Sequence, residues 1–112
     1  MARMSKAKKL ELAENSSDPA ELELLAADKV DDVRWEVATN PNTPASVLEK
    51  LAGDELGNVR WSVAEHTNTS EALLEKLAGD EDSVVRRSVV EHPNTPVSLL
   101  EKLAGDEDVR CE

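Results

Sequence analysis

The sequence predicts an all-α solenoid, in which pairs of short helices stack along one axis. The first observation is repetition: the segment Glu-Lys-Leu-Ala-Gly-Asp-Glu occurs three times, starting at Glu49, Glu75 and Glu101, always 26 residues apart. A fixed period in this range is typical of stacked repeat architectures. The second is composition, because 112 residues with no Phe or Tyr and only two Trp must build their core from Leu, Val and Ala. Such a core suits thin layers packed against neighbouring layers.

Aligned on this period, the aliphatic residues fall into columns. The columns are Leu22, Leu48, Leu74 and Leu100; Leu25, Leu51, Leu77 and Leu103; Ala26, Ala52, Ala78 and Ala104; Val33, Val59 and Val85; and Val37, Val63 and Val89. The Leu, Leu and Ala columns are spaced i, i+3, i+4, so they share one helix face. We therefore expect about 3.5 repeats, with residues 16–112 as a single solenoid domain. Residues 1–15 form a basic N-terminal segment or capping helix.

The first helix of each unit begins at Asn-Thr-Pro or Asn-Thr-Ser, as at residues 42–44, 68–70 and 94–96. Thr is a good N-cap, because its hydroxyl can accept an N–H of the first turn. Pro at the next position lacks only an N–H that would have no partner there. Gly53, Gly79 and Gly105 follow the Leu and Ala columns, where a left-handed C-terminal residue is expected.

The second element of each unit runs from near Asp32, Asn58 or Val84 to near Asn40, His66 or His92. Its two Val columns lie four residues apart, on one side of a helix. The element is little more than two turns long, so it is either α or 3₁₀. Neither element could bury its apolar stripe unaided, and stacking of the repeats is therefore what stabilises the fold.

The residues from Val33 to Asp54 read Val-Arg-x-x-Val-Ala-x-Asn-Pro-Asn-Thr-Pro-x-x-x-Leu-x-x-Leu-Ala-x-Asp, and the pattern recurs in degraded form at 59–80 and 85–106. This pattern resembles the leucine-rich repeat variant family over about residues 16–110. The resemblance implies an armadillo-like, right-handed superhelix of paired short helices, one α and the other α or 3₁₀. Some members hold an iron–sulfur centre in an N-terminal cysteine cluster. This chain has no Cys before Cys111, so we expect no cofactor.

The formal net charge of −11 is unevenly distributed. Residues 1–10 carry a net charge of +4, and the other 102 residues therefore sum to −15. Nucleic acid is an unfavourable partner for such an array, because binding to a phosphate backbone requires Lys and Arg. A basic protein partner is electrostatically easier. Solubility alone is the stronger explanation of the acidity, because net charge keeps a repeat protein soluble and monomeric.

Trp35 and Trp61 occupy one column, two residues after the core Val, and Arg87 takes the next place in it. Two residues on a helix turn the side chain by about 200°, so these rings point away from the Val column. They either complete the hydrophobic layer by packing on the neighbouring helix row, or form an exposed hot spot for a protein partner. The change to Arg87 favours a surface role, because a core column would resist Arg.

A second column consists of Arg34, Arg60, Arg86 and, two residues early, Arg110. Guanidinium groups one layer apart could bind phosphates or carboxylates. The alternative, which we favour, pairs each Arg with an Asp of the column Asp54, Asp80 and Asp106 and ties the layers together.

His66 and His92 align in adjacent units, and each follows a Glu, Glu65 or Glu91. A metal site would need a third ligand and a shorter spacing than one layer, so we predict none. Their equivalence to Asn40 indicates a role at the end of a turn. No nucleophile motif, phosphate-binding loop or other catalytic signature is present, so we predict that the protein is not an enzyme.

The chain ends within a unit, at Val109-Arg110-Cys111-Glu112, which would leave the last Leu layer partly uncovered. One hypothesis is that this open end is covered in a homodimer, with Cys111 near its symmetry mate. The basic start lacks the apolar stretch of a signal peptide, and no apolar run is long enough to span a bilayer, so a cytoplasmic location is expected.

The function that this sequence predicts is a non-enzymatic protein–protein interaction module or scaffold. Its partner is a protein, with a basic one favoured, bound on a face that includes Trp35, Trp61 and Arg87. The alternative is an anion or nucleic-acid-backbone binder that uses the Arg column, and a third possibility is a purely structural array or spacer.

Overall fold

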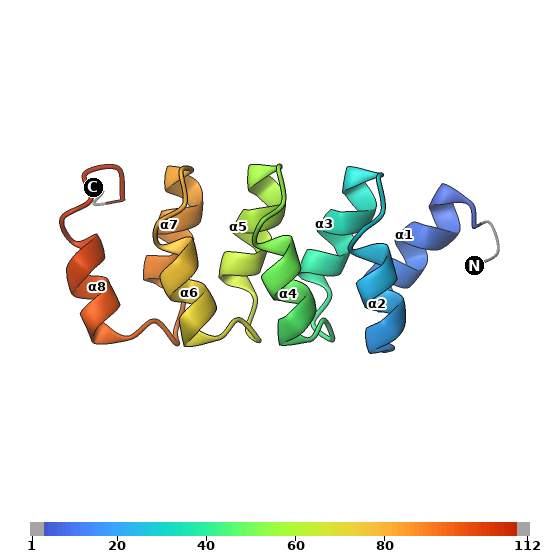
Figure 1. Ribbon diagram of the computed structural model, residues 1–112, viewed down its shortest axis with the longest axis horizontal. Helices are drawn as coiled ribbons and strands as arrows, with labels where there is room; N and C mark the ends of the chain where they lie inside the picture. Colours follow the sequence, from blue (N-terminus) through green and yellow to red (C-terminus); the bar gives the residue numbers. More distant parts are fainter. Residues whose placement is uncertain (1–3, 110–112) are drawn as a thin grey trace.

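The computed structural model describes residues 4–109, which form eight α-helices and no strand (Figure 1). They stack into an elongated array of 49 × 20 × 19 Å, which confirms the predicted all-α solenoid. None of these helices is both long and apolar enough to cross a membrane. Their bounds are α1 (Lys6–Asn15), α2 (Pro19–Leu25), α3 (Asp31–Thr39), α4 (Ala45–Leu51), α5 (Gly57–Glu65), α6 (Glu71–Leu77), α7 (Ser83–Glu91) and α8 (Val97–Leu103).

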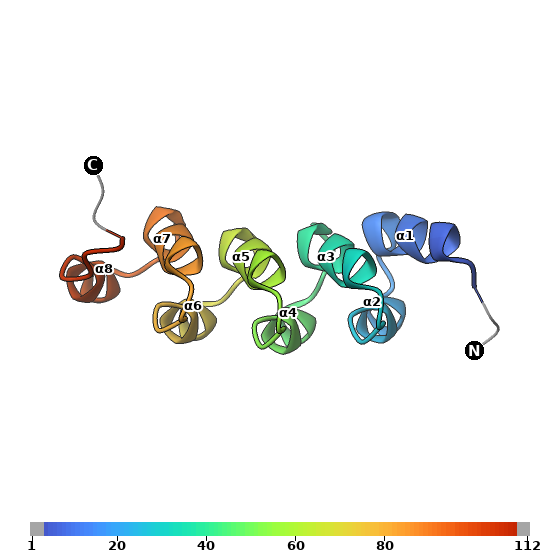
Figure 2. The ribbon, with the colours of Figure 1, turned by 90° about the horizontal axis from the view of Figure 1, so that it is seen from above.

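The helices form two parallel rows, which Figure 2 shows from above. We call α1, α3, α5 and α7 the odd-helix row, and α2, α4, α6 and α8 the even-helix row. Neighbours in the odd-helix row pack closely on each other, whereas each even-numbered helix packs mainly on the odd-numbered helices beside it. The second element of each repeat, left open between α and 3₁₀, is α-helical.

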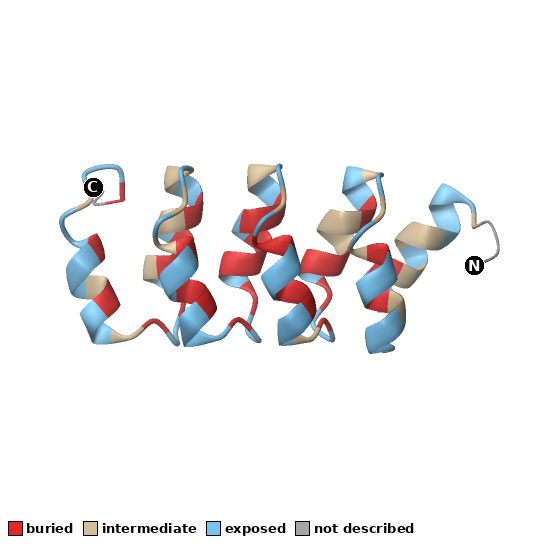
Figure 3. Cartoon of the chain, viewed as in Figure 1, coloured by how far each residue is buried: buried red, intermediate tan, exposed pale blue. Residues whose placement is uncertain are grey.

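The core lies between the two rows and runs along the whole array (Figure 3). The two Val columns are fully buried from Val33 to Val89, and Leu22, Leu48 and Leu74 are equally inaccessible. One buried column was not predicted from the sequence. It consists of Val47, Leu73 and Leu99, each one residue before the predicted Leu column. Adjacent buried positions widen the apolar stripe of the even-numbered helices, so these helices face the core broadly.

Helix α1 occupies the start of the odd-helix row and packs against α3. It begins after Ser5, whose hydroxyl accepts a hydrogen bond from the Lys8 backbone N–H at 3.1 Å. Ala13 is fully buried and Leu10 packs against the core. The basic N-terminal segment therefore contains the helix that covers the first Val layer.

The Thr residues do not cap the helices that follow them, contrary to the sequence expectation. The N-caps are Pro44, Ser70 and Pro96, each one residue later. The Thr43 hydroxyl instead donates to the Val37 carbonyl at 2.6 Å, near the end of α3. Thr69 and Thr95 make the same bond to the helices before them. The Thr side chain is buried, so it satisfies a buried carbonyl rather than an N–H at the solvent side.

The glycines after the Leu and Ala columns are not left-handed, which also corrects the sequence expectation. No described glycine has a positive φ. The chain continues past α4 in a tighter turn instead, where Gly53 N–H donates to the Lys50 carbonyl and Asp54 N–H to the Leu51 carbonyl. Bonds between residues three apart satisfy the last carbonyls of the helix without a left-handed residue.

We expect Gly53→Ala to stabilise the array by about 0.4–1 kcal/mol, because Ala reduces the freedom of the unfolded chain at a position that it can adopt. A Cβ at Gly53 would meet only the Lys50 carbonyl, at 3.7 Å, and the first repeat already has Ala27 in this position. Denaturant unfolding measures the change. The matched control is Gly57→Ala, whose Cβ would lie 2.6 Å from an Asp82 carboxylate oxygen and should give no gain.

Candidate functional site

The Arg column forms ion pairs between successive repeats, as the favoured sequence interpretation predicted. The Arg34 Nε–H donates to Asp54 Oδ2 at 2.6 Å, and the bond recurs from Arg60 to Asp80 at 2.9 Å. Arg86 donates to Asp106 in the same way at 2.6 Å. Each pair joins residues 20 positions apart, one on an odd-numbered helix and one just after the even-numbered helix of the next repeat.

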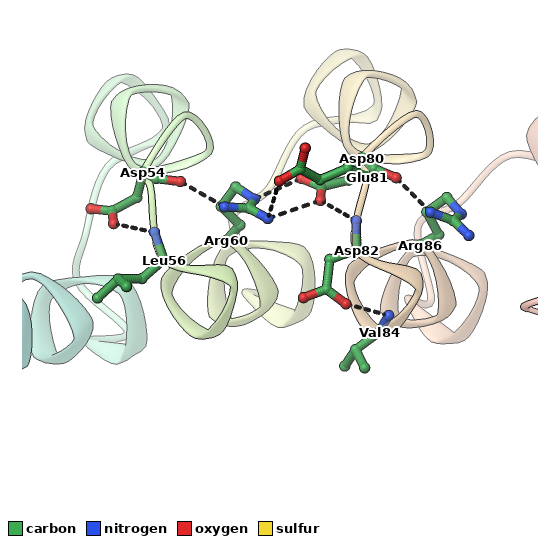
Figure 4. A network of polar contacts seen from close by, with 8 residues as sticks. All are labelled: Asp54, Leu56, Arg60, Asp80, Glu81, Asp82, Val84 and Arg86. Carbon is green, nitrogen blue, oxygen red and sulfur yellow. Dashed lines mark hydrogen bonds and ion pairs between the residues drawn. The ribbon is translucent and has the colours of Figure 1, made fainter.

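Each guanidinium also binds the turn of its own repeat, so the contacts form a continuous ladder. Figure 4 shows Arg60 between Asp54 and Asp80. Its Nη1 donates to the Asp54 carbonyl at 2.8 Å, while the Asp54 carboxylate accepts from the Leu56 N–H at 2.9 Å. The Arg86 guanidinium lowers the pKa of Asp106, since the hydrogen bond favours the charged carboxylate. We call the pairs Arg34–Asp54, Arg60–Asp80 and Arg86–Asp106, together with the carbonyl contacts of these arginines, the Arg–Asp ladder.

In the Arg–Asp ladder, the guanidinium groups that were candidates for anion binding form hydrogen bonds with the protein itself. Arg34 donates to both carboxylate oxygens of Asp54 and to the carbonyls of Asp28 and Lys29. These bonds engage all three nitrogens of the guanidinium. Arg110, the last member of the column, lies outside the described residues.

A second ladder runs along the array through the turns after the odd-numbered helices. The His66 Nε2–H donates to the Asn40 carbonyl at 2.7 Å, and His92 Nε2–H donates to the His66 carbonyl at 2.8 Å. The ring Nδ1 of His66 accepts from the Asn68 N–H at 3.0 Å, which fixes the tautomer. Both ring nitrogens are thus bound to backbone groups, in the turn-end role that alignment with Asn40 indicated. No group of three potential metal ligands occurs in the described part of the chain.

The predicted binding residues Trp35, Trp61 and Arg87 all lie on the odd-helix row, on α3, α5 and α7 respectively. Trp35 is half-buried and packs against the core, whereas Trp61 is 37% exposed. Arg87 is exposed and its Nη2 donates to the Asp108 carbonyl at 3.1 Å. Trp35 thus contributes to the hydrophobic layer, whereas Trp61 is still mostly covered but presents part of its ring to solvent.

An open groove of about 650 Å³ lies beside Trp35, where α1 meets α3. Its walls include Glu14 from α1 and Glu36 from α3, together with Thr39 and the turn that follows α3. Glu14 and Glu36 were not predicted from the sequence, because neither belongs to a repeated column. Only the packing of α1 on α3 brings them together with the indole ring.

Two smaller grooves, of about 220 and 380 Å³, follow along the odd-helix row, one repeat apart, and neither has a Trp among its lining residues. The groove between α3 and α5 is lined by Thr39, Ser62, Glu65 and His66, among others. The groove between α5 and α7 includes Glu65 and Glu91. All three contain at least one Glu, and none has a Lys or Arg among its lining residues. We call them the odd-row grooves.

Glu36 differs electrostatically from the carboxylates of the Arg–Asp ladder. Partial burial, reinforced by the neighbouring Glu14 and Asp32 carboxylates, raises the pKa of Glu36. No cation of the described residues lies within ion-pair distance of it. Asp28, by contrast, is paired with Lys9 at 2.9 Å. Glu36 therefore sits in a groove that lacks a positive charge.

We expect Glu36→Gln to raise the melting temperature near neutral pH and to have no such effect at a pH of about 3.5, below the ordinary pKa of Glu. A raised pKa means that the fold favours the protonated acid, so this contribution to stability is present in acid and is lost as the pH rises through the folded pKa. Thermal unfolding at both pH values measures the effect. Glu49→Gln, an exposed change on α4, is the charge-matched control. An equal rise for both variants would contradict the prediction.

The part of the C-terminal hypothesis that involves Cys111 falls outside the described residues, so self-association through that end stays a prediction. Within the described chain, Leu103 of the last helix is buried and Leu100 is half-buried.

Comparison with known protein families matches the leucine rich repeat variant model at residues 31–56 and again at 84–108. The first match covers α3 and α4 and the second covers α7 and α8 almost completely. The matched unit therefore pairs an odd-numbered helix with the even-numbered helix that follows it, so it is offset by one helix from the repeat defined from the sequence. In this register the pairs Arg34–Asp54 and Arg86–Asp106 each lie within one unit. Neither the curated proteins nor the solved structures gave a significant match.

Proposed function

Since the chain is built from leucine rich repeat variant units, we propose that it is a non-enzymatic protein-interaction module that binds its partner along the odd-helix row. The observation that carries the proposal is Trp61, a large aromatic side chain that is 37% exposed one repeat along from the Trp35 groove. Trp is among the residues that most often dominate binding energy at protein interfaces. The two rings lie on neighbouring odd-numbered helices, which pack closely on each other.

The structure gives less support to the anion-binding alternative. Its guanidinium groups are engaged by carboxylates and carbonyls of the chain, and freeing one would leave a largely buried Asp unpaired. The net charge of −11 adds a repulsion toward phosphate groups. A pure spacer would not require a partly exposed Trp61 on the same row as Trp35, and Trp is among the residues that most often dominate protein interfaces, which favours an interaction role over that possibility.

Replacing both rings tests the proposal. Ligands can be selected from a displayed peptide library with the wild-type protein, and their affinities measured for the variant Trp35→Ala/Trp61→Ala. We expect affinity to fall at least about tenfold, because the variant removes the aromatic anchors of the face. Circular dichroism shows whether the variant keeps its helices.

The matched control is Leu24→Ala/Val97→Ala, which removes two exposed apolar side chains of the even-helix row. This variant should bind the selected ligands as well as the wild type does. Equal losses in both double variants, or no loss in a folded Trp variant, would contradict binding along the odd-helix row.

A further inference from the structure

From the odd-row grooves we infer the partner's chemistry: an extended basic segment in the polyproline II conformation, with Arg or Lys at every third residue, one cationic side chain for each groove. This inference rests on the proposed function, since it specifies the ligand of the same face. It follows from the charge, the aromatic wall and the spacing of the grooves, which are independent observations.

Charge is the first observation. The odd-row grooves contain Glu14, Glu36, Glu65 and Glu91, and no Lys or Arg lines them. The aspartates that come just after the even-numbered helices lie near the other end of the odd-numbered helices, and all four are paired. The pairs are Asp28 with Lys9, Asp54 with Arg34, Asp80 with Arg60 and Asp106 with Arg86. The described part of the chain thus supplies a cation for each of these four carboxylates but none within ion-pair distance of the groove carboxylates, which leaves the grooves complementary to a cation from outside.

The aromatic wall is the second observation. In the first groove the Trp35 indole lies with Glu14 and Glu36 around one open space of about 650 Å³. A guanidinium or ammonium group there could lie against the ring and face the carboxylates at once. Attraction between a cation and an aromatic face is strongest for Trp, and it grows when the cation is partly shielded from water. A neutral or acidic side chain would gain neither contact.

Spacing is the third observation. The grooves are one repeat apart, and Glu65 and Glu91 occupy equivalent positions in successive repeats. Neighbouring packed helices have axes about 8–10 Å apart. A polyproline II helix rises about 3.1 Å per residue with three residues per turn, so side chains of every third residue lie on one side, about 9 Å apart. A β-strand alternates its side chains between two faces, so every third residue of a strand would point away.

Two synthetic peptides of equal composition test the inference. One is a nine-residue Arg-Pro-Pro repeat, and the other has three consecutive Arg followed by six Pro. Both Trp residues of the chain lie on this face, so intrinsic fluorescence reports binding directly. At about 0.15 M salt, where long-range attraction is screened, we expect the periodic peptide to bind about tenfold more tightly than its isomer.

Substitutions locate the binding in the grooves. Glu36→Gln should lower the affinity for the Arg-Pro-Pro peptide about fivefold. Glu49→Gln, the same charge change on the even-helix row, should leave this affinity within about twofold of that of the wild type. Equal affinities for the two peptides, or equal losses in the two variants, would mean that net charge alone attracts them and would overturn the inference. Absence of binding by either peptide would overturn it as well.

The two proposals can fail separately. A library ligand that requires Trp35 and Trp61 but lacks cations three residues apart would overturn the inference and leave the proposed function standing. Ligands that bind folded Trp35→Ala/Trp61→Ala as well as wild type would contradict the proposed function itself.

Discussion

Replacing Arg60 with Ala is expected to destabilise the array by about 3 kcal/mol, because it leaves the Asp80 carboxylate without its cation in a largely buried site. The Arg60 and Asp80 side chains are only 11% and 9% exposed, respectively. The variant also removes the hydrogen bond from Arg60 Nη1 to the Asp54 carbonyl, so two adjacent repeats lose a contact at once. Urea unfolding followed by circular dichroism measures the change.

Arg87→Ala is the matched control, since Arg87 is the next residue after a ladder arginine but is exposed. We expect its effect to stay within about 0.5 kcal/mol. The double variant Arg60→Ala/Asp80→Ala should be less destabilised than the sum of the two single variants, because neither charge is then left alone. If Arg60→Ala were no worse than Arg87→Ala, the ladder would contribute little to holding the repeats together.

Leu74→Ala is expected to cost about 3–4 kcal/mol, within the range for buried Leu residues whose cavity cannot collapse. Leu74 is fully buried in α6, with further repeats on both sides, so no end of the array can relax around it. The free energy of unfolding of ordinary domains is about 5–15 kcal/mol, so this loss is a large fraction of the total.

The control for this change is Leu24→Ala on α2, where the side chain is 59% exposed and its loss should cost less than about 0.5 kcal/mol. Repeat arrays are stabilised by contacts between neighbours, so a defect in a central repeat also reduces cooperativity. A lower denaturant m-value for Leu74→Ala would report this loss, because part of the array would unfold first. An unchanged m-value together with a small loss of stability would contradict a continuous core.

The two ladders and the core have different parts in presenting the proposed binding face. The Arg–Asp ladder fixes the repeats at one end of the odd-numbered helices, and the ladder through Asn40, His66 and His92 fixes them at the other. With both ends held, we expect the angle between neighbouring odd-numbered helices to change little when a ligand binds. A binder with such a rigid face loses less entropy when the partner docks.

Two details of the fold could not be predicted from the sequence. The Thr residues looked like caps, since Thr next to Pro favours a helix start, yet the hydroxyl of Thr43 is buried and bonds backward to Val37. Gly53 was expected to adopt a left-handed conformation, yet hydrogen bonds in the turn after α4 satisfy the last carbonyls of that helix without it. Both are choices between local alternatives of similar energy, and packing decided between them.

The sequence by itself determined the repeat, the helix pairs, the buried Leu and Val columns and the pairing of Arg34 with Asp54, because each depends on a periodic pattern that every unit repeats. Only the tertiary structure decided that Trp35 is half-buried while Trp61 is exposed, and that Glu14 and Glu36 share a groove. Glu14 and Glu36 belong to no repeated column, and the repeated Trp35 and Trp61 have different neighbours, because Trp35 lies beside Glu14 of α1. Such contacts depend on how neighbouring helices pack, which no periodic pattern encodes.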